Sequence, residues 1–342
     1  MPPVGGDAAL TQPPASSTSV STSSCWTWQG RTIRYRCLAG PEPAGLQRVV
    51  LIHGFGASLG HWRHNLPAIA SRFSACAIDL LGFGGSDKPR SRLADEAEQP
   101  GAVRYCFDLW AEQVADFVQQ VALQHAPSAR VHLVGNSIGG VVALRAAQLL
   151  VARGVPLAQV ILIDCAQRTL DEKRVADLPL LERWSRPLVK QLVRQRWLVA
   201  PLFRTLARPA FIRQVLGRAY PSGANIDDAL VELLHRPSTD TGASESFRGF
   251  VNLFDDHLAP ELLAELTVPV RMLWGAEDPW EAPAEAERWA RSFACVQELK
   301  VLPGLGHCPH DEAPERVNPI LLDWLEAGSG AAAEAQRAWE IT

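Results

Sequence analysis

The stretch that decides the fold is residues 131–151, which read VHLVGNSIGGVVALRAAQLLV. Its first four residues predict a buried strand, and residues 141–151 predict a buried helix because nearly every side chain is apolar. Between them Gly135, Ser137 and Gly139 form the pattern G-x-S-x-G. At a strand-to-helix turn this pattern is typical of a strained elbow that projects the serine hydroxyl beyond the sheet edge.

Strand and helix patterns alternate on both sides of this stretch. Apolar runs predict strands at 48–52, 75–78, 131–134, 160–163, 268–274 and 298–302, and helical spacing predicts helices at 62–70, 109–121, 141–151 and 314–325. This order predicts the α/β class, with a mostly parallel sheet flanked by helices.

The alternation stops between the fourth and fifth predicted strands, where a helical segment reads as a cap inserted into one sheet. The predicted organisation is a disordered tail at 1–25, a core at 26–166 and 268–326, a cap at 167–267 and a flexible tail at 327–342.

Composition excludes several classes of protein. Hydrophobic residues make up 47% and charged residues 20%, which is enough to build a core. The net charge of −4 argues against nucleic-acid binding.

Seven cysteines without a C-x-x-C pair argue against a disulfide framework and favour a reducing compartment, so we expect a cytoplasmic protein. Every long apolar run is interrupted, so no membrane-spanning helix is expected.

The serine of the elbow needs a base and an acid to become a nucleophile. His307 follows the last predicted strand and is the expected base. Asp278, in the loop after the strand at 268–274, is the favoured acid. Asp164, which ends the strand at 160–163, is the alternative acid, although its favoured interpretation is a cap of local backbone N–H groups.

An oxyanion formed at Ser137 needs two N–H donors. The backbone N–H of Ile138 is one candidate, and that of Phe55 is the other because Gly54 and Gly56 allow close approach to a substrate. His53 is expected to order this loop through hydrogen bonds. Neither the histidines near residue 61 nor residues 307–311 match a metal-binding motif, so no metal and no cofactor are expected.

Five segments together resemble the α/β-hydrolase superfamily over residues 26–326. They are HGFGASLGHW (53–62), DLLGFGGSDKP (79–89), GNSIGG (135–140), LWGAEDPW (273–280) and GHCPHDEAP (306–314). Within the superfamily the chain is most similar to the pheophytinase and chlorophyll dephytylase group of plants and cyanobacteria. The resemblance implies hydrolysis of the phytyl ester of a chlorophyll-type pigment, with the triad on Ser137, Asp278 and His307.

One residue departs from the pattern of that group, which has proline where this chain has His53. A different ester substrate therefore stays open. The alternatives are a general carboxylesterase or lipase-like enzyme, a C–C bond hydrolase of the same fold, or a non-catalytic binding protein. Epoxide hydrolases and dehalogenases resemble the chain less, because their nucleophile is aspartate and here the elbow carries Ser137.

The cap contains an amphipathic pattern in which basic residues are interleaved with apolar ones. The apolar members are Leu181, Trp184, Leu188 and Leu192, and the basic members are Arg183, Arg186, Lys190 and Arg194. Two interpretations stay open: peripheral contact with an anionic membrane surface, such as a thylakoid, or a lid whose apolar face covers the active site. The lid is favoured.

The chain is rich in tryptophan, with 11 Trp against 3 Tyr. Trp62, Trp184 and Trp280 are the candidates to line a pocket for an apolar ester. The expected partner is therefore a small hydrophobic ester, bound by a monomeric protein.

Overall fold

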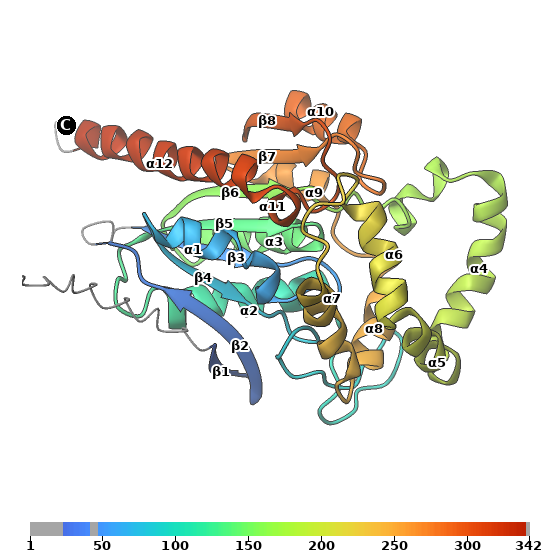
Figure 1. The fold of residues 1–342 in the computed structure, drawn as a ribbon. Coiled ribbons are helices and arrows are strands. Elements are labelled where there is room, and N and C mark those ends of the chain that lie inside the picture. Colours follow the sequence, from blue (N-terminus) through green and yellow to red (C-terminus); the bar gives the residue numbers. More distant parts are fainter. Residues whose placement is uncertain (1–22, 42–46, 340–342) are drawn as a thin grey trace, which may run out of the picture.

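The computed structural model describes residues 23–41 and 47–339, and this part of the chain contains one eight-stranded sheet with helices on both faces (Figure 1). The strand order is β1-β2-β4-β3-β5-β6-β7-β8. Pairing is parallel from β4 to β8 and antiparallel among β1, β2 and β4. The strands are β1 (Ser24–Trp28), β2 (Arg31–Leu38), β3 (Gln47–Ile52), β4 (Ser74–Ile78), β5 (Arg130–Asn136), β6 (Leu157–Ile163), β7 (Val270–Gly275) and β8 (Val296–Leu302). The predicted fold class is confirmed.

The hairpin of β1 and β2 is the part of the sheet that the sequence patterns do not predict. Its residues alternate weakly, and most of them are exposed or half-buried at the sheet edge. Gln29 and Gly30 join the two strands with φ of 49° and 75°. Two consecutive positive φ values match the right-handed twist of a two-residue hairpin turn.

Helices on the two faces bury two separate apolar clusters. The helices α2 (Phe107–Phe117), α3 (Ile138–Ala152), α9 (Ala259–Glu265) and α10 (Pro283–Ser292) contribute to the larger cluster. The helices α1 (Asn65–Ala70) and α12 (Pro314–Trp339) contribute to the smaller one on the other face. α3 is buried along most of its length, as its apolar sequence predicts.

Short helical turns complete the core, at η2 (Leu59–Trp62), η3 (Val118–Ala122) and α11 (Pro309–Glu312). The last helix is longer than expected, because α12 continues beyond residue 325 through the segment predicted to be a flexible tail. Residues 340–342 of that tail lie outside the described residues, as do residues 1–22 of the predicted N-terminal tail.

Most of the segment between β6 and β7 forms a helical layer beside the sheet's C-terminal edge (Figure 1). Its members are η4 (Glu172–Asp177), α4 (Leu180–Arg194), α5 (Arg196–Leu206), α6 (Pro209–Ala219), α7 (Asp228–His235), η5 (Arg236–Thr239) and α8 (Ala243–Val251). A small apolar cluster that includes Leu216, Tyr220 and Leu230 holds α6 and α7 against Cys308 of the core.

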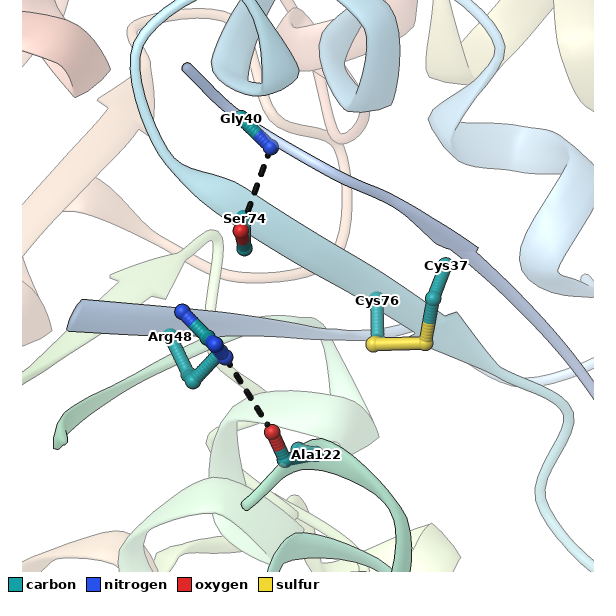
Figure 2. Close-up of a disulfide and its surroundings, with 6 residues drawn as sticks. All are labelled: Cys37, Gly40, Arg48, Ser74, Cys76 and Ala122. Carbon is teal, nitrogen blue, oxygen red and sulfur yellow. Dashed lines mark hydrogen bonds between the residues drawn. A yellow bond between two sulfur atoms is a disulfide. The ribbon is translucent and has the colours of Figure 1, made fainter. Parts of the chain in front are cut away.

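A disulfide joins β2 to β4 through Cys37 and Cys76 (Figure 2). The spacing of the cysteines does not predict this bridge, and the preference for free thiols is wrong for this pair. The cause is the antiparallel register, which places Cys37 directly opposite Cys76 with their Cα atoms 4.0 Å apart. Among the described residues, no helix is long and apolar enough to cross a membrane.

Candidate active site

Ser137 occupies a strained turn between β5 and α3. Its φ and ψ are 55° and −123°, a backbone conformation that few non-glycine residues adopt. The turn is sharp because a Cβ on Gly135 would collide with the carbonyl of Gly139, and a Cβ on Gly139 would collide with the carbonyl of Ile52. The geometry predicted for the G-x-S-x-G elbow is therefore present, and Ser137 stands at the N-terminus of a buried helix.

The loop after β8 brings His307 to the same sheet edge, where it pairs with Asp278 from the loop after β7. His307 Nδ1 lies 2.8 Å from Asp278 Oδ2, and the tautomer with the proton on Nδ1 makes this a hydrogen bond. The other carboxylate oxygen of Asp278 accepts the backbone N–H groups of Trp280 and Glu281, at 2.9 and 3.1 Å. Neither Ser137 Oγ nor His307 Nε2 has a hydrogen-bond partner within residues 23–41 and 47–339, so both atoms are available for reaction.

The carboxyl group of Asp278 is kept ionised by its partners. Burial favours the neutral acid, but the hydrogen bond and positive charge of His307 outweigh burial and hold the pKa of Asp278 below its ordinary value. Asp278 is thus prepared to orient the imidazole and to stabilise it when it is protonated.

Asp164 lies beside Asp278 rather than beside the histidine. Its Oδ1 accepts the N–H of Gly275 at 2.9 Å, and its side chain is fully buried with a positive φ of 44°. Asp164 therefore caps the end of the neighbouring strand β7, not the entry to the cap segment as expected. The structure pairs His307 with Asp278, and the alternative acid Asp164 makes no hydrogen bond to His307 in the described residues.

The carboxyl groups of Asp164 and Asp278 are close enough for each to affect the pKa of the other. Burial, followed by the negative charge of Asp278, raises the pKa of Asp164 well above its ordinary value. Oδ2 of Asp164 is buried and meets no hydrogen-bond donor among the described residues. A proton on this atom removes the electrostatic repulsion between the two carboxylates. The directions of the two pKa shifts therefore make Asp164 the neutral member and Asp278 the ionised member of the pair, as in other sites where two carboxyl groups cannot both be charged.

A third carboxyl group, Glu281, completes the acidic side of the site and is missed by sequence reasoning. Burial raises the pKa of Glu281 to about 7, and the nearby positive charge of His307 opposes that rise. Its Oε2 accepts the backbone N–H of Gln167 at 2.7 Å. Glu281 lies three residues beyond Asp278, but no sequence signal separates it from the exposed acidic residues of the same loop.

The two expected oxyanion donors lie on either side of the elbow. The N–H of Ile138 begins α3, and within the described residues neither it nor the N–H of Phe55 meets a backbone or side-chain acceptor. The Phe55 loop approaches the serine so closely that a Cβ on Gly54 would lie 3.1 Å from Ser137 Cβ. A larger residue at position 54 would need the serine or Asn136 side chain to shift, so glycine favours the close approach of this loop to the nucleophile.

His53 contacts the backbone of this loop through hydrogen bonds, as expected. Its Nδ1 lies 2.7 Å from the carbonyl of Gly54, and its Nε2 accepts the N–H of Leu80 at 3.1 Å. Complete burial lowers the pKa of His53 to about 4, so the ring is neutral near pH 7.

Phenylalanines rather than tryptophans line the hollow next to the Phe55 loop. The ring of Phe55 stacks on Phe250 with centroids 3.9 Å apart. Beside it, Phe83 of the core and Phe203 and Phe247 of the helical layer line an apolar pocket. The pocket therefore runs from the candidate oxyanion donor towards α5 and α8.

Two of the three tryptophans expected to line the pocket do not lie there. Trp62 is fully buried in the smaller core cluster and packs against His310, because η2 turns its ring inwards. Trp184 is 83% exposed on the outer side of α4. Trp280 does lie at the site, since its ring meets the edge of His307 with centroids 4.9 Å apart.

The acidic residues after His307 attach the helical layer to the core. Asp311 binds Arg63 at 2.8 Å and accepts the hydroxyl of Tyr220 at 3.0 Å. Glu312 accepts the hydroxyl of Ser222 at 2.6 Å. In the described part of the chain, no group of three or more His, Cys, Asp or Glu side chains could hold a metal ion.

The chain belongs to the alpha/beta hydrolase family, whose model matches residues 49–320. The chloroplastic pheophytinase of Arabidopsis thaliana is 27% identical over 90% of this chain and 66% of its own length. The chain thus spans slightly less than two thirds of that relative.

Two solved structures illustrate the shared fold. Epoxide hydrolase CorEH superposes with a TM-score of 0.69 at 18% identity, covering 90% of this chain and 99% of that one. A thermophilic esterase from Thermogutta terrifontis superposes with a TM-score of 0.64 at 21% identity and covers the same shares. The predicted superfamily is confirmed, and the chain is a hydrolase of this fold.

Proposed function

We propose that this hydrolase cleaves a carboxylic ester with a large apolar group, using Ser137 as its nucleophile. The observation that carries the proposal is the pair of His307 and Asp278, 2.8 Å apart at the sheet edge that carries the serine elbow. A serine on the elbow argues against epoxide hydrolysis by an aspartate nucleophile, although an epoxide hydrolase shares the fold.

The reaction proceeds in two steps. Ser137 Oγ attacks the ester carbonyl while His307 Nε2 accepts its proton, and the N–H groups of Phe55 and Ile138 stabilise the oxyanion. Collapse of the tetrahedral intermediate breaks the C–O bond to the alcohol, which leaves with the proton from His307. Water then gives a proton to His307 and attacks the carbonyl of the acyl-enzyme. The carboxylic acid product is released, and His307 returns the proton to Ser137 Oγ.

We propose the phytyl ester of a chlorophyll-type pigment as the substrate. Support comes from the likeness to pheophytinase and from the phenylalanine side chains of the small pocket beside Phe55, which offer an apolar surface to a hydrocarbon group. A general carboxylesterase, a C–C bond hydrolase and a non-catalytic binding protein are the outcomes against which the proposal is tested.

Three measurements separate these outcomes. Labelling of Ser137 by a fluorophosphonate, absent in Ser137→Ala, is expected and would exclude a binding protein. Turnover of a p-nitrophenyl ester should fall by at least about three orders of magnitude in Ser137→Ala, while the variant keeps its fold. Release of phytol from pheophytin tests the pigment. Activity on simple esters alone would leave a carboxylesterase, and retained turnover without Ser137 would overturn the whole mechanism.

A further inference from the structure

The helix α4 exposes an apolar stripe to solvent. Leu181, Trp184, Leu188 and Leu192 lie on one face at helical spacing, with exposed fractions of 81%, 83%, 60% and 41%. Figure 1 shows α4 at the margin of the helical layer, remote from the sheet. The interpretation that this apolar face covers the active site is therefore wrong for α4. A soluble helix normally turns such a face inwards, so exposed apolar surface of this extent marks an interaction site.

Basic residues occupy the opposite face of α4 and bind it to the body of the protein. Arg186 is buried, donates to the carbonyl of Leu170 and lies over the ring of Phe254. Lys190 pairs with Glu172, and Arg194 pairs with Asp95 at 2.7 Å. These contacts hold the orientation of the helix, so its apolar stripe cannot turn inwards without breaking them.

The exposed apolar surface extends from α4 into α5 and α6. Nine of the fourteen large apolar side chains exposed by the described residues lie between residues 180 and 211. In α5, Trp197 is 74% exposed while Phe203 lines the pocket. The same helix therefore connects the exposed face to the pocket.

The segment that carries the exposed apolar surface is strongly cationic, although the whole chain carries a net charge of −4. Residues 180–219 contain nine basic residues and one acidic residue, Glu182. The side chains of four exposed arginines of this segment make no hydrogen bond or ion pair with any described part of the chain: Arg183, Arg204, Arg208 and Arg218. A segment that exposes both apolar side chains and unpaired cations can contact both the acyl chains and the anionic headgroups of a membrane surface.

We propose that α4 and α5 form a docking face for an anionic lipid bilayer. Trp184, Leu181 and Leu188 enter the boundary between headgroups and acyl chains, and the free arginines bind lipid phosphates. A second copy of the chain is a poorer occupant, because a symmetric contact would bring the unpaired arginines of the two copies together. The proposal does not depend on the reaction catalysed, since it stands on the exposed stripe and its charge.

Sedimentation of the full chain with lipid vesicles tests the docking face. Wild-type protein is expected to bind vesicles of equal parts phosphatidylcholine and phosphatidylglycerol, more weakly as salt is raised. The double variant Trp184→Ser with Leu188→Ser should lose about tenfold or more in affinity. Arg183→Glu with Arg204→Glu should lose as much on these vesicles.

Matched controls keep the result interpretable. Val151→Ser removes an apolar side chain that is 44% exposed on α3, and Arg291→Glu reverses an exposed charge on α10, so both should bind like wild type. Thermal unfolding checks that each variant is folded. Absence of binding, or binding that the α4 variants leave unchanged, would overturn the proposal. A dimer abolished by the α4 variants, without vesicle binding, would assign the face to a second copy instead.

Discussion

The side-chain amide of Asn136 donates a hydrogen bond to the backbone carbonyl of His307 at 3.1 Å. A second bond from the same nitrogen reaches the carbonyl of Ile163 at 3.2 Å. The residue before the nucleophile thus ties the elbow to the histidine loop and to the end of β6. Asn136 acts as a positioning residue, because it touches the backbone of His307 and not the reacting atoms.

Replacement of Asn136 by leucine should therefore lower kcat by about ten- to a hundredfold with little change in KM, because the imidazole loses its fixed position. It should also cost about 1–3 kcal/mol of stability, since buried carbonyls lose a donor. Asn318→Leu is the matched control. The Asn318 side chain donates to the backbone carbonyl of His64 at 3.0 Å, and this hydrogen bond does not involve the serine elbow or the His307 loop. If both variants lose stability and neither loses kcat, Asn136 is merely structural.

The opposite pKa shifts of Asp164 and Asp278 lead to opposite expectations for two similar changes. Asp278→Asn should lower kcat by about three to four orders of magnitude, because the amide favours the wrong imidazole tautomer. Asp164→Asn should keep activity within about fivefold of wild type, because an amide is neutral like the protonated acid and still accepts the N–H of Gly275. Its pH–rate profile should keep the acid limb of wild type. A loss in Asp164→Asn as large as that in Asp278→Asn would mean that Asp164 is ionised and acts as the acid.

Glu281 should make stability fall as pH rises. Its folded pKa of about 7 lies above the ordinary value of 4.5, so the folded state holds the proton longer than the unfolded state. Relative to Glu281→Gln, wild type should lose on the order of 3 kcal/mol between pH 4.5 and pH 7, with little further change above that range. Urea unfolding of both proteins at several pH values measures the difference. A difference that is independent of pH would contradict a buried, titrating Glu281.

The chain's sequence predicts the parts of the site that follow strand ends. Ser137 directly follows β5, and Asp278 and His307 lie in the loops after β7 and β8. Parallel pairing collects such residues at one edge of the sheet. The sequence does not predict the proximity of Asp164 to Asp278, because this proximity depends on which strands are neighbours in the sheet. Only the register of β6 against β7 brings the two carboxyl groups together.

The orientation of α4 is equally hidden in its sequence. An amphipathic pattern has two faces, and periodicity alone does not say which of them meets the protein. Three partners elsewhere in the chain decide it, Glu172, Asp95 and Phe254, by binding the basic face. A tryptophan assigned to the pocket, Trp184, therefore lies at the surface instead.

The disulfide between Cys37 and Cys76 should contribute measurably to stability. It joins residues 39 apart in sequence, so chain-entropy arguments give about 4 kcal/mol for restricting the unfolded chain. Wild type in dithiothreitol and the double variant Cys37→Ser with Cys76→Ser should both unfold at lower urea than oxidised wild type. Cys25→Ser, which removes an exposed free thiol, should unfold like wild type. If thiol titration of the purified, unfolded protein counts all seven cysteines and dithiothreitol leaves the urea midpoint unchanged, the bridge does not form.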